Sequence, residues 1–136
     1  MDLTKLPIRI VQIMDRENIS TNGSATWTPR KFAPKDIQNV GPYLVGMRVH
    51  AKLAEKSTNF QYRVVGQWSV DGITWTDFAN PLLTTQSADG SVVSSEYTTT
   101  TDFGIFIRVS IQASNASGTA VENGVLTVFL VLHYIT

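Results

Sequence analysis

The sequence of 136 residues contains no cysteine, no long apolar run and no excess of charge of either sign. Without cysteine there can be no disulfide and no thiolate metal site, which argues against a small secreted disulfide scaffold. Its 11 basic residues are balanced by 11 acidic ones, whereas nucleic-acid binders usually carry a basic excess that neutralises phosphates. We therefore expect no nucleic-acid partner.

The N-terminal residues also lack the pattern of a signal peptide, because no basic segment is followed there by an apolar one. The most apolar run extends from Val125 to Ile135 and is too short to cross a bilayer, which takes about 20 residues. These absences predict a protein that is made in a cytoplasm and has no membrane partner.

Helical periodicity is nearly absent, and a strict alternation of apolar and polar residues takes its place. Apolar residues occupy alternate positions in three segments, from Tyr43 to Leu53, from Phe60 to Val70 and from Phe103 to Ala113. Such alternation is typical of strands with one buried face. The sequence therefore predicts one all-β domain over residues 1–136, an antiparallel β-sandwich of jelly-roll type with about eight strands.

The dipeptide Asp71-Gly72 lies between two alternating segments and predicts a β-hairpin. A two-residue type I′ turn needs positive φ at both central positions, which Asp-Gly tolerates. This turn would pair Val70 with Ile73 and Trp68 with Trp75. The pairing would place these four side chains on one apolar face.

Two segments lack alternation and are predicted to be loops. The first covers residues 15–42 and holds three prolines and two glycines, and the second covers residues 84–102 and is rich in Ser and Thr. Trp27 lies in the first loop and should be exposed, whereas Trp68 and Trp75 should face the core. Because sugars stack on flat aromatic rings, Trp27 is the candidate ligand contact.

The segment from Val125 to Ile135 is apolar on both faces of the expected strand, so both faces should be covered. A two-layer sandwich covers only one face of each strand. The second cover would come either from the long N-terminal loop or from another subunit, and the sequence leaves both alternatives open. If a subunit supplies it, the predicted self-association face consists of Leu126, Val128, Leu130, Leu132 and Tyr134.

No pattern of catalytic or metal-binding residues stands out. His50 and His133 have no Glu or His at ligand spacing, and a metal site needs several convergent ligands. Neither a Gly-x-Ser-x-Gly elbow nor a Gly-rich phosphate loop is present. Asp71 and Asp77 could form a carboxylate pair, but a turn and a strand end account for them. We expect no catalytic residue, no metal and no cofactor, and hence no enzyme.

The segment Ser69-Val70-Asp71-Gly72-Ile73-Thr74-Trp75 resembles the Asp-box of sialidase-type propellers, with one residue fewer between Asp and Gly. It occurs once, whereas propellers carry several copies, and similar hairpins occur in β-sandwich modules of phages. As a whole, the chain resembles small virion proteins of tailed bacteriophages. It shares with them its short length, its lack of cysteine, its abundant Ser and Thr, and an apolar C-terminal strand.

This resemblance implies a capsid decoration or cement protein, which binds coat subunits and carries out no reaction. It implies a homo-oligomer located in the virion, with a trimer favoured, and a partner that is the major capsid protein or another virion protein. Either the segment around Ile8-Arg9-Ile10-Val11 or the long loop after it would then reach onto a neighbour. The alternative is a carbohydrate- or receptor-binding module, such as a phage tail domain, in which Trp27 contacts the ligand.

Overall fold

A computed structural model describes residues 8–21, 28–32, 44–98, 105–118 and 120–134. These residues form nine strands, and none of them lies in a helix that could span a membrane. The strands are β1 (Ile8–Ser20), β2 (Thr28–Phe32), β3 (Leu44–Ala54), β4 (Phe60–Ser69), β5 (Thr76–Asp77), β6 (Leu83–Gln86), β7 (Gly90–Val93), β8 (Phe106–Asn115) and β9 (Asn123–Tyr134).

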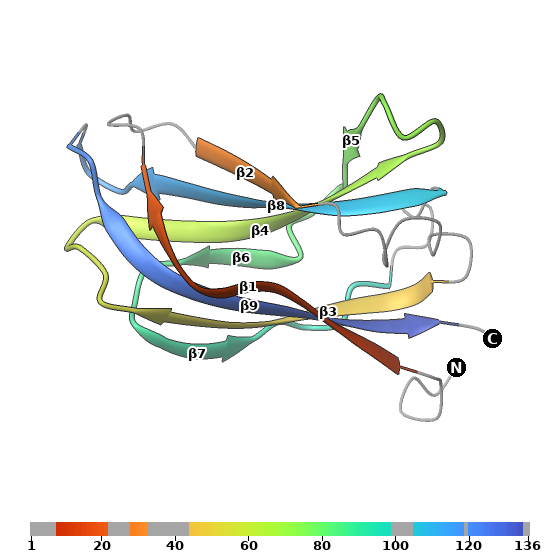
Figure 1. Cartoon of the computed structure of the whole chain (residues 1–136), viewed down its shortest axis with the longest axis horizontal. Helices are drawn as coiled ribbons and strands as arrows, with labels where there is room; N and C mark the ends of the chain where they lie inside the picture. The colour runs from red at the N-terminus through yellow and green to blue at the C-terminus, as the bar shows by residue number, and fades with distance from the viewer. Residues whose placement is uncertain (1–7, 22–27, 33–43, 99–104, 119, 135–136) are drawn as a thin grey trace.

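Two antiparallel sheets pack face to face (Figure 1). One sheet has the order β1-β9-β3-β7, and the other has the order β2-β8-β4-β5, with β6 also paired to β4. The pairs are nested along the chain, β1 with β9, β2 with β8, β3 with β7 and β4 with β6, and successive pairs alternate between the sheets. This is a jelly roll, and the predicted fold class is confirmed.

The core lies between the sheets and is built from alternate residues of the long strands, as the sequence pattern predicted. The side chain of Tyr62 is 1% exposed, and this burial raises its pKa to about 12, because a phenolate would lose its hydration. Six other core side chains of β4 and β8 have no exposed surface at all: Phe60, Val64, Ile107, Val109, Ile111 and Ala113.

Strand β3 departs from simple alternation at its start. Leu44 is buried and Val45 is only half-buried, the reverse of what the alternation predicted. A bulge between Leu44 and Gly46 shifts the register against β9 by one residue, and a one-residue shift exchanges the two faces of a strand. From Met47 onward the inward positions are those predicted.

The predicted loops are shorter than expected. Residues 15–20 belong to β1, and residues 28–32 form β2. Two bulges interrupt the pairing of β1 with β9, and each changes which positions face inward, so no single alternation runs through β1. In the second predicted loop, β6 and β7 are strands of four residues each, too short to give a clear periodic signal.

The connection at Asp71-Gly72 joins β4 to β5 as predicted, but in a different register. Trp68 pairs with Thr76 and not with Trp75, so the turn is longer than two residues. Of the two central residues, only Gly72 has a positive φ, at 74°, which excludes a type I′ turn.

Candidate functional site

The predicted self-association face of β9 lies in the core, and that prediction is wrong. Leu126, Val128 and Leu130 have no exposed surface and Leu132 is 1% exposed, since all four point from β9 toward the opposite sheet. They are covered within the chain and are not available to a second subunit. The side chain of Tyr134 lies outside the described residues.

The tryptophan residues offer no sugar-binding platform in the described part of the chain. Trp27, the predicted ligand contact, lies outside the described residues. Trp68 is partly buried and packs against the core. Arg108 lies over the ring of Trp75, with its guanidinium carbon 4.1 Å from the ring centroid, so one face of that ring already has a cation–π partner.

The outward face of β9 contributes instead to an apolar groove on the outside of the β1-β9-β3-β7 sheet. The strand register places Ile10 beside Val131 and Val131 beside Arg48. In the next row, Phe129 lies beside His50. This outer groove has a volume of about 380 Å³ and is lined by Ile8, Ile10, Arg48, His50, Phe129 and Val131.

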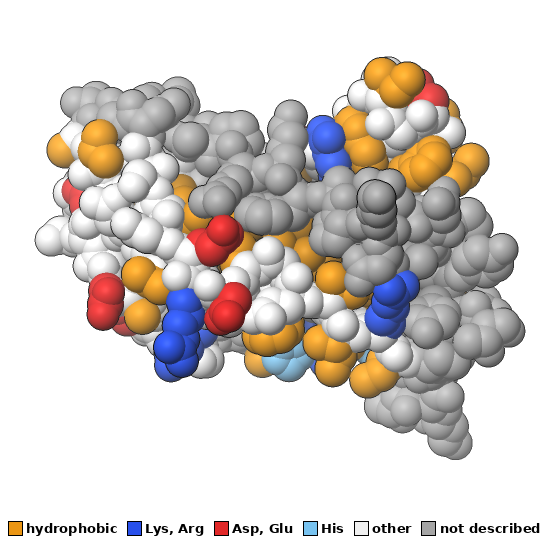
Figure 2. All heavy atoms as spheres, in the orientation of Figure 1, with side chains coloured by type: hydrophobic (Ala, Val, Ile, Leu, Met, Phe, Trp, Pro, Cys, Tyr) orange, Lys and Arg blue, Asp and Glu red, His pale blue; other side chains and the backbone are white. Residues whose placement is uncertain are grey.

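Apolar side chains at the outer groove face water. Ile8 is 52% exposed and Ile10 is 61% exposed, and both lie on the edge strand β1. Val93 of β7 pairs with His50 and is 54% exposed. Figure 2 shows hydrophobic side chains gathered along the lower side of the view around a histidine. A contiguous apolar patch of this kind is typical of an interaction surface.

Two polar nitrogens in this surface have no hydrogen-bond partner among the described residues. They are Nε of Arg48 and Nε2 of His50, and both are buried. A buried polar group without a partner costs roughly 1–3 kcal/mol. Because Arg48 also lines the groove, an occupant that brings a negative charge would be attracted to its guanidinium.

The outside of the other sheet is different, because its polar side chains satisfy one another across the β4–β8 pair. Each of the following donor–acceptor bonds joins β4 to β8: Gln61 Nε2 to Ser114 Oγ (2.8 Å), Arg63 Nε to Gln112 Oε1 (2.7 Å) and Arg108 Nε to Gln67 Oε1 (2.7 Å). The polar side chains of that face bond one another, whereas the lining of the outer groove is largely apolar.

A second exposed feature is the loop between β4 and β5, and we call its residues 70–74 the β4–β5 knob. The hydroxyl oxygen of Ser69 accepts a hydrogen bond from the Gly72 N–H at 2.9 Å. Oδ1 of Asp71 accepts hydrogen bonds from the N–H groups of Ile73 and Thr74, each at 2.8 Å. These side chains replace the missing cross-strand bonds and hold the wider turn in one conformation.

The knob carries aliphatic side chains at its tip. Val70 is 64% exposed and Ile73 is 83% exposed, whereas the sequence predicted that both would face inward. Figure 2 shows the knob protruding from the upper right of the molecule, with hydrophobic and acidic side chains at its end. The Asp71 hydrogen bonds therefore present two apolar side chains to solvent on an ordered loop.

The backbone hydrogen bonds from Thr74 and Ile73, and then the bond from Ser69, lower the pKa of Asp71 to about 2. Because the folded pKa lies below the ordinary 3.8, this carboxylate stabilises the loop above pH 3.8, and the effect is lost as the pH falls toward 2. We expect the Asp71 carboxyl carbon to titrate near pH 2 in a ¹³C NMR experiment. Ser69→Ala should raise that midpoint, and an unchanged midpoint would contradict the assigned hydrogen bond.

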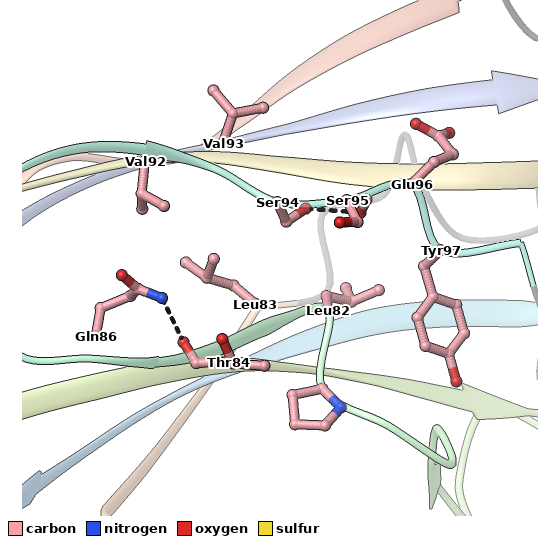
Figure 3. Close-up of a pocket in the computed structure, with 11 residues that line it drawn as sticks. Leu82, Leu83, Thr84, Gln86, Val92, Val93, Ser94, Ser95, Glu96 and Tyr97 are labelled. Atoms are coloured by element: carbon pink, nitrogen blue, oxygen red, sulfur yellow. Dashed lines mark hydrogen bonds between the residues drawn. The ribbon is translucent and has the colours of Figure 1, made fainter.

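A second hollow lies between the sheets at the edge formed by β6 and β7 (Figure 3). It has a volume of about 320 Å³, and Leu83 and Val92 point into it from opposite sides, whereas Val93 points away. Its polar groups already have partners in the protein: Ser94 Oγ accepts from the Val49 N–H of β3 at 2.8 Å, and Gln86 Nε2 donates to the Thr84 carbonyl at 3.1 Å. This hollow offers no convergent polar groups.

The two histidines have separate environments. His50 lines the outer groove, and Nδ1 of His133 lies 2.5 Å from Oε1 of Glu96. Gly46, which pairs with His133, makes room for this contact, because a Cβ at Gly46 would lie 2.5 Å from the same carboxylate oxygen. No pattern in the sequence indicated this pair. No group of three or more His, Asp or Glu side chains in the described ranges could hold a metal ion.

No protein-family model matches the sequence. No curated protein matches it either. Solved structures are similar to it in fold. The structure of infectious bursal disease virus, Gt strain, matches with a TM-score of 0.59 and 10% identity, over 96% of this chain and 32% of that chain. The crystal structure of the infectious bursal disease virus VP2 subviral particle matches with a TM-score of 0.50 and 10% identity, over 95% of this chain and 33% of that chain.

The likeness extends over nearly all of this chain, while the chain spans about a third of the length of the virus chains it matches. At 10% identity it carries no residue-by-residue correspondence. The likeness shows a shared fold, so this chain is a jelly-roll domain that is similar in fold to part of the chains in those virus structures.

Proposed function

We propose that this protein is a structural component of a virus particle, which acts by binding neighbouring protein subunits and catalyses no reaction. The observation that carries the proposal is the outer groove, an exposed apolar sheet face on a jelly-roll fold, with two nitrogens that have no partner in the described part of the chain. The fold likeness to structures of a virus and of a subviral particle supports it.

Within that role we propose a decoration or cement protein of a tailed bacteriophage, bound to coat subunits as a trimer. The resemblance in the sequence supports this finer assignment. A decoration protein stabilises a shell that other subunits have built, so its contribution is buried interface area. The outer groove provides apolar area for such a contact.

The test is made on the virus whose genome encodes this chain. We expect quantitative mass spectrometry of density-purified particles to find the protein at a fixed ratio to the major coat protein. We also expect particles from a deletion strain to assemble, and to release their genome at a lower temperature than wild-type particles do. Re-expression of the wild-type chain should restore the higher temperature.

Two results would overturn these proposals separately. Absence of the protein from purified particles would refute the structural role. Failure of the deletion strain to form any shell would keep the structural role but refute decoration, because the chain would then be needed to build the shell.

A further inference from the structure

The outer groove and the β4–β5 knob complement each other in shape and in charge. The groove is concave and apolar, and its polar groups are the nitrogens of Arg48 and His50. The knob is convex, and it presents exposed Val70 and Ile73 together with the carboxylate of Asp71. An aliphatic tip with an adjacent anion is the kind of occupant that the groove lacks.

Each partner is preorganised for this contact. The knob is fixed by the hydrogen bonds that Asp71 Oδ1 and Ser69 Oγ accept, so docking would cost little ordering of the loop. Those bonds converge on Oδ1 of Asp71, and the carboxylate lies on an exposed loop, where a cation such as the Arg48 guanidinium of a second copy can approach it. The groove is built on the paired strands β1, β9 and β3.

The two features cannot meet within one molecule. The groove lies on the outside of the β1-β9-β3-β7 sheet, whereas the knob extends from the ends of β4 and β5 in the opposite sheet (Figure 1). We propose that the knob of one copy docks into the outer groove of the next copy, with Val70 and Ile73 on the apolar floor and Asp71 beside Arg48. This inference deepens the proposed function, on which it rests, by naming a second copy of this chain as the partner.

A contact of this kind is heterologous, because two different surfaces of identical chains meet. Repetition of the contact closes a ring if the rotation between copies allows it, and otherwise builds an open chain. In either case one copy can donate a knob and accept a knob at the same time. A copy without a working knob can still accept, and a copy without a working groove can still donate.

Because each copy has one donating and one accepting surface, each surface can be disabled by itself. The experiment measures self-association of the purified full chain by sedimentation velocity over a concentration series. The knob variant combines Val70→Ser with Ile73→Ser, and the groove variant combines Ile8→Ser with Ile10→Ser. All four side chains are more than half exposed, so both variants should keep the wild-type circular dichroism spectrum. The matched control is Val121→Ser, which alters a side chain that is 59% exposed and lies outside both surfaces.

We expect wild type and the Val121→Ser control to self-associate, and each variant alone to do so at least about tenfold more weakly. An equimolar mixture of the two variants should form heterodimers and stop there, because it contains one working knob and one working groove per pair. Raised salt should weaken the association of the wild type, since the contact includes a charge pair.

Three results would overturn the knob-and-groove contact. The first is a wild type that stays monomeric at every concentration, and the second is a variant mixture that forms no heterodimer. The third is self-association of either single variant that is as strong as that of the wild type, which would place the contact elsewhere on the molecule. None of the three bears on the presence of the protein in particles, so the proposed function is tested independently.

Discussion

Leu130→Asp is expected to unfold the protein. Leu130 has no exposed surface and lies in the core on β9, the strand that joins β1 to β3. An aspartate there would place a carboxylate between two apolar sheets with no partner, a cost of several kcal/mol that consumes most of the stability of a small domain. Circular dichroism and size-exclusion chromatography should show loss of the folded monomer at neutral pH.

The milder variant Leu130→Ala should stay folded, so that its loss of stability can be measured. Removal of the buried side chain leaves a cavity and should lower the free energy of unfolding by about 2–5 kcal/mol, measured by urea denaturation. Ile73→Ala is the matched control, because it deletes the same number of carbons from a side chain that is 83% exposed. It should change stability by less than about 0.5 kcal/mol.

The Leu130→Asp result also tests where this side chain lies, in the core or at a surface between subunits. A folded Leu130→Asp variant with altered oligomeric state would mean that this side chain faces a partner. An unfolded one places it in the core, as the structure does.

Gly66→Ala should be the most damaging small substitution in β4. A Cβ at Gly66 would lie 2.4 Å from two ring carbons of Phe78, closer than real carbon atoms approach. Phe78 is buried, and its ring stacks on Tyr97 at a centroid distance of 5.2 Å. The backbone of Tyr97 in turn forms an isolated β-bridge with Met47 of the opposite sheet. The Phe78 ring therefore cannot move without disturbing the contact between the sheets.

We expect Gly66→Ala to lower the free energy of unfolding by about 1–3 kcal/mol, the usual cost of overpacking. Gly118→Ala is the control, since a Cβ there meets only ordinary contacts with Asn115 at 3.8 Å or more. In a double-mutant cycle, the combination of Gly66→Ala with Phe78→Leu should be less damaging than the sum of the two single changes. Strict additivity would show that the ring does not oppose the added methyl group.

The sequence alone determined the fold class and most of the core. Alternation with period two is a local signal, because a strand turns successive side chains to opposite faces whatever it packs against. It therefore identified the inward residues of β4 and β8, and those of β3 from Met47 onward. It failed where a bulge breaks the period, as in β1, and where a strand has four residues, as in β6 and β7.

Only the tertiary structure decided which apolar face of β9 is covered and which surfaces are free. The sequence shows two apolar faces there, and the choice depends on which side of β9 meets the opposite sheet. That choice is set by pairing with β1 and β3, which are distant along the chain. The same holds for the outer groove, whose lining comes from these three strands, and for the knob, where the side-chain hydrogen bonds of Asp71 replaced the turn that its dipeptide predicted. Long-range pairing assembles such surfaces, and no local pattern records it.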